Sequence, residues 1–161
     1  NLPGIPHSSP EQLFLPPGGT VTITGGTQDM GINFRENMCT GYFAEQSEFK
    51  PALSRRCPRI DTKTLADTLD DKCLLILPKI STCKVPTQSQ LFGQSPACTD
   101  YMTQNLNYAG CVRNNKNDVK FYSNTWYIWV QRSKSEELFR NIHETVTLYD
   151  ANGKFVDKQA Y

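Results

Sequence analysis

The sequence predicts a mainly β scaffold that carries a disulfide-bonded helical-hairpin insertion. Residues 20–24 and 125–130 place their apolar side chains with a period of two, which is typical of strands. All six cysteines lie between residues 39 and 111, where apolar side chains recur at helical spacing. Because this region is flanked on both sides by strand-like sequence, we interpret residues 39–111 as an insertion into a β fold.

Length and composition fit one domain over residues 1–161. Lysine and arginine number 17 against 16 acidic residues, and this near balance argues against strong, sequence-blind binding to nucleic acid. No apolar run reaches the length of about 20 residues that spans a bilayer.

Six cysteines without a CxxC pair favour three disulfides over zinc, so we expect a secreted, extracellular or cell-surface protein. The chain begins at Asn1, and we interpret it as a mature, processed or excised product.

The first strand is expected at residues 20–24, after an extended lead-in over residues 1–11 and a Pro-Pro-Gly-Gly turn signal. Val21 and Ile23 would share one face of this strand. The sequence is irregular from residue 27 to residue 59, and a loop of that length needs a tether. We expect a Cys39–Cys57 disulfide to supply it.

Two helices are predicted over about residues 61–77 and 95–107. Asp61 or Thr62 would cap the first, and Ser95 followed by proline would begin the second. In an antiparallel helical hairpin, Cys83 and Cys98 would lie near the turn. Cys73 and Cys111 would lie two to three helical turns away, which favours the pairs Cys83–Cys98 and Cys73–Cys111. Six cysteines permit fifteen pairings, so the alternatives stay open.

The C-terminal strands are expected within residues 121–161. Residues 125–130 are apolar on both faces, and Asn152-Gly153 separates two further strands in a hairpin pattern. We predict that Tyr127 and Trp129 are buried under the helical hairpin; an exposed aromatic platform is the alternative. The predicted core consists of Trp126, Ile128, Val130, Val146, Leu148 and Phe155.

This C-terminal stretch resembles the closing strands of lamin-tail domains. The resemblance is carried by the tryptophan strand at 126–130, the Thr-Leu-Tyr-Asp run at 147–150, Asn152-Gly153-Lys154 and the final Tyr161. The turn and strand at 14–23 look like an element nearer the family's N-terminus, and the cysteine-rich segment looks like an insertion of prokaryotic secreted members. The resemblance implies an immunoglobulin-like β-sandwich without catalytic residues of its own.

The chain departs from the lamin-tail pattern in lacking the family's opening acidic strand and its "dLsGw" segment. A sandwich without them has an uncovered edge, and such an edge is open to strand addition by another chain. We therefore expect a protein partner or self-association by strand addition.

No catalytic, cofactor-binding or metal-binding residues are predicted. His7 and His143 are far apart in the sequence, and a surface or capping role fits each better than catalysis. Asp150, Asn152 and Asp157 have the spacing of a hairpin turn rather than of an EF-hand.

The expected function is a non-enzymatic extracellular structural or adhesive interaction module, with self-assembly as one form. The alternative is a nucleic-acid- or carbohydrate-binding accessory module of a secreted hydrolase. A small hydrolase is the third hypothesis, and it would need His143 beside a carboxylate or nucleophile. The candidate ligand surface for the alternative consists of Arg55, Arg56, Arg59, Arg113, Lys116 and Lys120, although solvated surface is the simpler reading of these cations.

Overall fold

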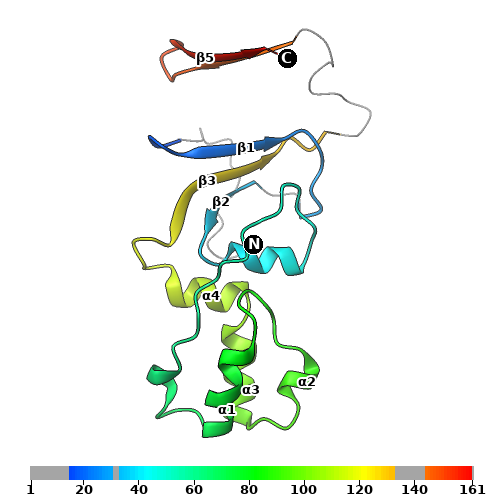
Figure 1. The fold of residues 1–161 in the computed structure, drawn as a ribbon, viewed down its shortest axis with the longest axis vertical. Helices are drawn as coiled ribbons and strands as arrows, with labels where there is room; N and C mark the ends of the chain where they lie inside the picture. The colour runs from blue at the N-terminus through cyan, green and yellow to red at the C-terminus, as the bar shows by residue number, and fades with distance from the viewer. Residues whose placement is uncertain (1–14, 31–32, 133–143, 161) are drawn as a thin grey trace.

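A computed structural model describes residues 15–30, 33–132 and 144–160. These residues form two small sheets and a helical part. Three disulfides cross-link the segment from residue 39 to residue 111, which contains nearly all of the helical residues. Figure 1 shows the β4–β5 hairpin at one end of the long axis, the three-stranded sheet in the middle and α1 to α3 at the other end. The strands are β1 (Thr20–Thr24), β2 (Phe34–Asn37), β3 (Tyr122–Trp129), β4 (Thr145–Tyr149) and β5 (Phe155–Ala160). The helices are η1 (Thr40–Glu45), η2 (Thr62–Leu65), α1 (Asp71–Ile76), η3 (Leu77–Lys79), α2 (Gln88–Leu91), α3 (Pro96–Asn105) and α4 (Tyr108–Asn115).

The first sheet has the order β1-β3-β2, with β3 in the centre. β1 is parallel to β3, with Val21 opposite Trp126, and β2 is antiparallel to it, with Phe34 opposite Tyr127. The strand predicted at residues 20–24 is observed as β1, and β3 begins earlier than the predicted strand at 125–130. Sequence reasoning did not find β2, which is only four residues long and has Arg35 and Glu36 at its centre.

One face of this sheet carries an aromatic core that includes Phe34, Phe43, Phe49 and Trp129, each at most 5% exposed. The ring of Phe34 makes an edge contact with Phe43 at 5.3 Å between centroids and lies 5.7 Å from Trp129. The predicted core face of β3 was therefore the wrong one. The clustered phenylalanines cover the face of Trp129, whereas Trp126 and Ile128 on the other face are only half-buried. Of the two aromatic residues predicted to be buried, Trp129 is buried and Tyr127 is half-buried, and both pack in this aromatic cluster and not under a helical hairpin.

The second sheet is the β4–β5 hairpin, which pairs Val146 with Gln159 and Leu148 with Asp157. Asp150 organises its turn, because the carboxylate oxygen Oδ1 accepts the N–H groups of Asn152 and Lys154 at 2.9 Å. Gly153 adopts a φ of +77°, while Asn152 stays outside the left-handed region, so the turn differs from the two-residue form with two positive φ angles.

Four predicted core positions are exposed instead. Val130 lies directly after β3 and is 40% exposed. The other three lie on the hairpin, where no second layer of described residues packs, and Val146, Leu148 and Phe155 are 37% to 57% exposed. Their period of two gave the correct secondary structure for Val146, Leu148 and Phe155. It could not reveal whether another layer covers the strand.

The helical part has a separate apolar cluster that includes Leu69, Leu77, Met102 and Leu106. The helix predicted over 61–77 is divided, because the side chain of Asp70 accepts the N–H of Cys73 at 2.9 Å and starts α1 afresh. The helix predicted over 95–107 begins as expected, with Ser95 as N-cap and Pro96 in the first turn. It ends at Asn105. Asn107 then caps α4, which the sequence did not indicate as a separate helix.

All six cysteines are bonded, but in the pairs Cys39–Cys111, Cys57–Cys83 and Cys73–Cys98. The expected pairs Cys39–Cys57, Cys83–Cys98 and Cys73–Cys111 are all wrong. The Cys39–Cys57 pair was expected as a tether for the irregular loop, and the other two pairs assumed two helices in an antiparallel hairpin. Instead, Cys73 and Cys98 are both third residues of their helices, and the two N-caps meet, since the hydroxyl of Ser95 donates to the Asp70 carboxylate.

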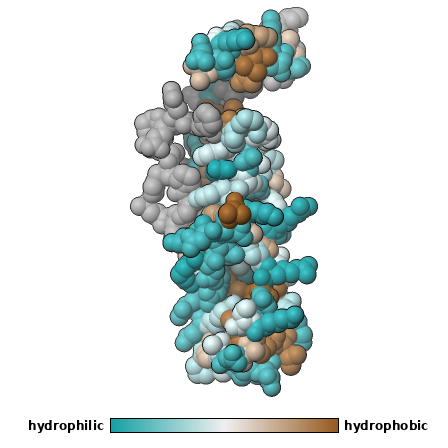
Figure 2. Space-filling model, turned by 90° about the vertical axis from the view of Figure 1, so that its left-hand side faces the viewer, coloured by the Kyte–Doolittle hydropathy of each residue, from teal (hydrophilic) through white to brown (hydrophobic). Residues whose placement is uncertain are grey.

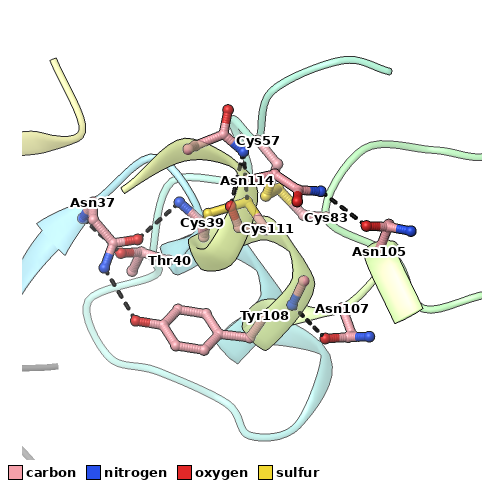
Figure 3. The surroundings of a disulfide bond; sticks show 12 residues. Asn37, Cys39, Thr40, Cys57, Cys83, Asn105, Asn107, Tyr108, Cys111 and Asn114 are labelled. Carbon is pink, nitrogen blue, oxygen red and sulfur yellow. Dashed lines mark hydrogen bonds between the residues drawn. A yellow bond between two sulfur atoms is a disulfide. The ribbon is translucent and has the colours of Figure 1, made fainter. Parts of the chain in front are cut away.

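The Cys39–Cys111 bond lies where the helical part leaves and rejoins the sheet (Figure 3). Asn37 ends β2 beside this bond and is buried, and its side chain is well bonded. Oδ1 accepts the N–H of Cys39 at 2.8 Å, and Nδ2 donates to the hydroxyl of Tyr108 at 3.1 Å. Because a cross-link restricts the unfolded chain more when it closes a longer loop, this bond contributes about 4.4 kcal/mol in the chain-entropy account, against about 3.5 kcal/mol for each of the other two.

Candidate interaction surfaces

The β4–β5 hairpin presents apolar side chains to solvent on both of its faces. Its large apolar side chains are between 37% and 58% exposed, and Figure 2 shows brown hydrophobic residues among teal hydrophilic ones at this end of the molecule. We call this the hairpin surface; it consists of Val146, Leu148, Tyr149, Phe155 and Val156. Exposed apolar groups that gather on one element in this way are typical of interaction sites.

The β1 strand forms one edge of the three-stranded sheet. Its described pairing partner is β3 alone, so its other backbone edge has no strand beside it within the described residues. Ile23 on this strand is 59% exposed. Next to it on β3, the indole N–H of Trp126 is buried without a hydrogen-bond partner. An edge of this kind can accept a further strand.

A cleft of about 500 Å³ opens in the helical part, next to Tyr42 of η1. Its walls come from four separate segments: η1, residues 58–60, residues 77–84 and the end of α3. Leu77, Ile80 and Leu106 give it apolar surface, and Arg59 and Lys84 are the charged residues of its lining. We call this the apolar cleft.

A second cavity of about 340 Å³ adjoins the apolar cleft and shares Tyr42, Arg59 and Leu106 with it. Its remaining lining is mostly polar and includes Asp61, Tyr101 and the asparagines of α3 and α4, namely Asn105, Asn114 and Asn115. Burial raises the pKa of Tyr42, and Tyr101 raises it further. Burial also raises the pKa of Tyr101. Both hydroxyls therefore stay protonated at neutral pH and can donate hydrogen bonds.

The six cations of the predicted ligand surface belong to different parts of the fold. Arg59 lines the apolar cleft, whereas Arg55 lines a separate cavity with Phe49 and Leu53. Arg113 donates from Nη2 to the carbonyl of Gln104 at 2.8 Å. Arg56, Lys116 and Lys120 are exposed. Of these six predicted residues, Arg59 alone lines the apolar cleft.

Among the described residues, no group of three or more histidines, cysteines or acidic residues is placed to hold a metal ion. His7 and His143 lie outside the described residues. None of the described helices is long and apolar enough to cross a membrane. Every cysteine is disulfide-bonded, which is compatible with an extracellular protein.

Comparison with known proteins gives no matching family model, no matching curated protein and no matching solved structure.

Sequence reasoning missed the apolar cleft and most of the aromatic core. Tyr42, Pro58, Leu77 and Leu106 come from four segments, and no local pattern relates them. A usable signal existed for the core, because Phe34, Phe43 and Phe49 are close in the sequence and surround Cys39. Apolar side chains that gather around a disulfide cysteine are candidates for the core.

Proposed function

We propose that this chain is a non-enzymatic extracellular module of structural or adhesive type, and that it associates with protein through its hairpin surface. The observation that carries the proposal is the exposure of Leu148, Phe155 and their neighbours on a two-stranded sheet. A two-stranded sheet is marginally stable alone and gains stability when an apolar face packs on it or a third strand joins it. Self-association is the form that the chain can undertake without another component.

The extracellular part of the proposal rests on the three disulfides, which persist in oxidising compartments. The non-enzymatic part rests on the lamin-tail resemblance and on the cysteines, because a bonded cysteine offers no thiolate nucleophile. We include the lamin-tail family and its immunoglobulin-like sandwich in the proposal. Both are supported by strands at three of the quoted motifs: β1, β3 and the β4–β5 hairpin.

Sedimentation velocity of the full chain from micromolar to millimolar concentration tests the proposal. We expect the weight-average sedimentation coefficient to rise with concentration. Leu148→Glu should abolish this rise, because a charge in an apolar contact loses its water without gaining a partner. The matched control is Val119→Glu, since Val119 is 96% exposed and lies outside the hairpin. A rise that Leu148→Glu leaves unchanged, or a chain that stays monomeric throughout, would refute association through this surface.

A further inference from the structure

The apolar cleft is a second site, separate from the hairpin surface, and its lining indicates the chemistry of its ligand. We propose that it binds a peptide segment of a partner protein that presents an aliphatic side chain next to a carboxylate. The aliphatic group would occupy the apolar part of the cleft, and the carboxylate would meet Arg59 at its rim. The aliphatic group and the carboxylate are each indicated by separate residues of the lining.

The aliphatic half rests on the apolar lining. Leu77, Ile80 and Leu106 are at most 8% exposed, yet each also contributes to the cleft wall. Pro58, Ile60 and Pro78 add further apolar surface. A volume of about 500 Å³ lies within the usual range of ligand pockets and admits a branched side chain together with the backbone on either side.

The carboxylate half rests on the charge of the rim. The lining of the cleft contains two cations, Arg59 and Lys84, and no carboxylate. Lys84 has an acidic neighbour outside the cleft, with its Nζ 3.4 Å from the Glu45 carboxylate. Arg59 is exposed and has no ion pair within the described part of the chain. A guanidinium beside an apolar pocket is suited to bidentate binding of a carboxylate.

The adjoining cavity favours a peptide over a small acid. Asn115 donates from Nδ2 to the carbonyl of Cys111, and Asn114 donates from Nδ2 to Asn105 at 3.0 Å (Figure 3 labels Asn114 and Asn105). These bonds orient the two amides without involving their oxygens, so the side-chain oxygens of Asn114 and Asn115 remain as acceptors for peptide N–H groups. Asp61 also lines this cavity, which makes it a poor place for the carboxylate itself.

The Cys57–Cys83 disulfide holds the cleft in shape. Cys57 precedes Pro58 and Arg59 on one wall, and Cys83 lies between Thr82 and Lys84 on the other. Gly41 permits the disulfide to approach η1, since a Cβ at this position would lie 2.3 Å from the Cys83 sulfur. A covalently fixed cleft loses little conformational entropy when a ligand enters.

Titration of the isotope-labelled full chain with three acetylated pentapeptides, followed by NMR, tests the proposal. The first probe is acetyl-Gly-Ser-Gly-Ser-Leu with a free C-terminal carboxylate. The second is its C-terminal carboxamide, and the third carries serine in place of the leucine. We expect the first peptide to shift the amide signals of Ile60, Thr82 and Leu106 with millimolar affinity. The other two should bind at least about fivefold more weakly, because each lacks one of the two matched groups.

Arg59→Ala should weaken the first peptide about fivefold while leaving the carboxamide unaffected. Arg56→Ala is the matched control, because Arg56 is exposed and lines neither cavity. The proposal is overturned if no cleft signal shifts, if the carboxylate and carboxamide bind equally, or if Arg56→Ala has the same effect as Arg59→Ala. These readouts do not involve β4 or β5, so failure here and failure of the hairpin association are separate results.

Discussion

Truncation of Phe34 is the sharpest test of where the core lies. Its side chain is 1% exposed and is surrounded by four aromatic rings. The centroids lie 5.3 Å away for Phe43, 6.1 Å for Phe49, 5.5 Å for Tyr127 and 5.7 Å for Trp129. Phe34→Ala removes these contacts and leaves a cavity, which costs about 3–5 kcal/mol. Phe155→Ala acts on a ring that is 55% exposed and should change the free energy of unfolding by no more than about 0.5 kcal/mol.

The assay is urea unfolding with the disulfides intact, followed by tryptophan fluorescence and analysed by linear extrapolation. Protein concentration is kept low, so that association through the hairpin surface does not contribute. Phe34→Leu provides a variant that still folds if the alanine variant does not. It should cost roughly 1–2 kcal/mol, because leucine fills part of the space and forfeits the edge contacts between rings. A Phe155→Ala variant as unstable as Phe34→Ala would refute the reasoning, since it would mean that the hairpin belongs to the core.

Three further predictions concern the helical part. Gly110→Ala should destabilise the chain by about 2 kcal/mol or more, because the new Cβ would lie 2.2 Å from the carbonyl oxygen of Gln104. Gly26→Ala is the neutral control, since a Cβ at that position has nothing within 4 Å. Thermal unfolding compares the stability of the two variants. Hydrogen bonds from Ser95 and from the N–H of Cys73 lower the pKa of Asp70 from its usual 3.8, so its charge stabilises the fold above that pH and the contribution is lost as pH falls through the lowered value. Asp70→Asn should therefore flatten the dependence of melting temperature on pH in the acid range, and an unchanged slope would contradict this. Non-reducing peptide mapping should yield Cys39–Cys111, Cys57–Cys83 and Cys73–Cys98, whereas a Cys39–Cys57 peptide would show that the observed pairing is wrong.

Local signals predicted those elements of the fold that depend on neighbours in the sequence. The period of two located β1, most of β3 and β4, and the Ser95-Pro96 cap located the start of α3. Features that depend on tertiary packing were not predictable in this way. The buried face of β3 is decided by Phe34, Phe43 and Phe49, and the exposure of Leu148 reflects the lack of a covering layer among the described residues.

The predicted pairs Cys83–Cys98 and Cys73–Cys111 depended on one global assumption, the antiparallel helical hairpin. Once Asp70 starts α1 five residues after η2 ends, Cys73 moves to the first turn of a short helix and meets Cys98. Cys111 then belongs to α4, which turns away after Leu106 and packs beside η1 and the sheet. The capping carboxylate of Asp70 therefore accounts for the unexpected partner of Cys73.

The Cys39–Cys111 bond also determines how the chain would respond to mechanical tension. β2 ends two residues before Cys39, and β3 lies on the far side of Cys111, so a pull applied through these two strands passes across the sulfur–sulfur bond. The intervening chain has a sequence separation of 72 residues, and with all three disulfides reduced it would add roughly 250 Å when fully extended. Under oxidising conditions that length cannot be drawn out, and the apolar cleft keeps its shape under load. Reduction of all three bonds would turn a short, stiff tether into a long, extensible one.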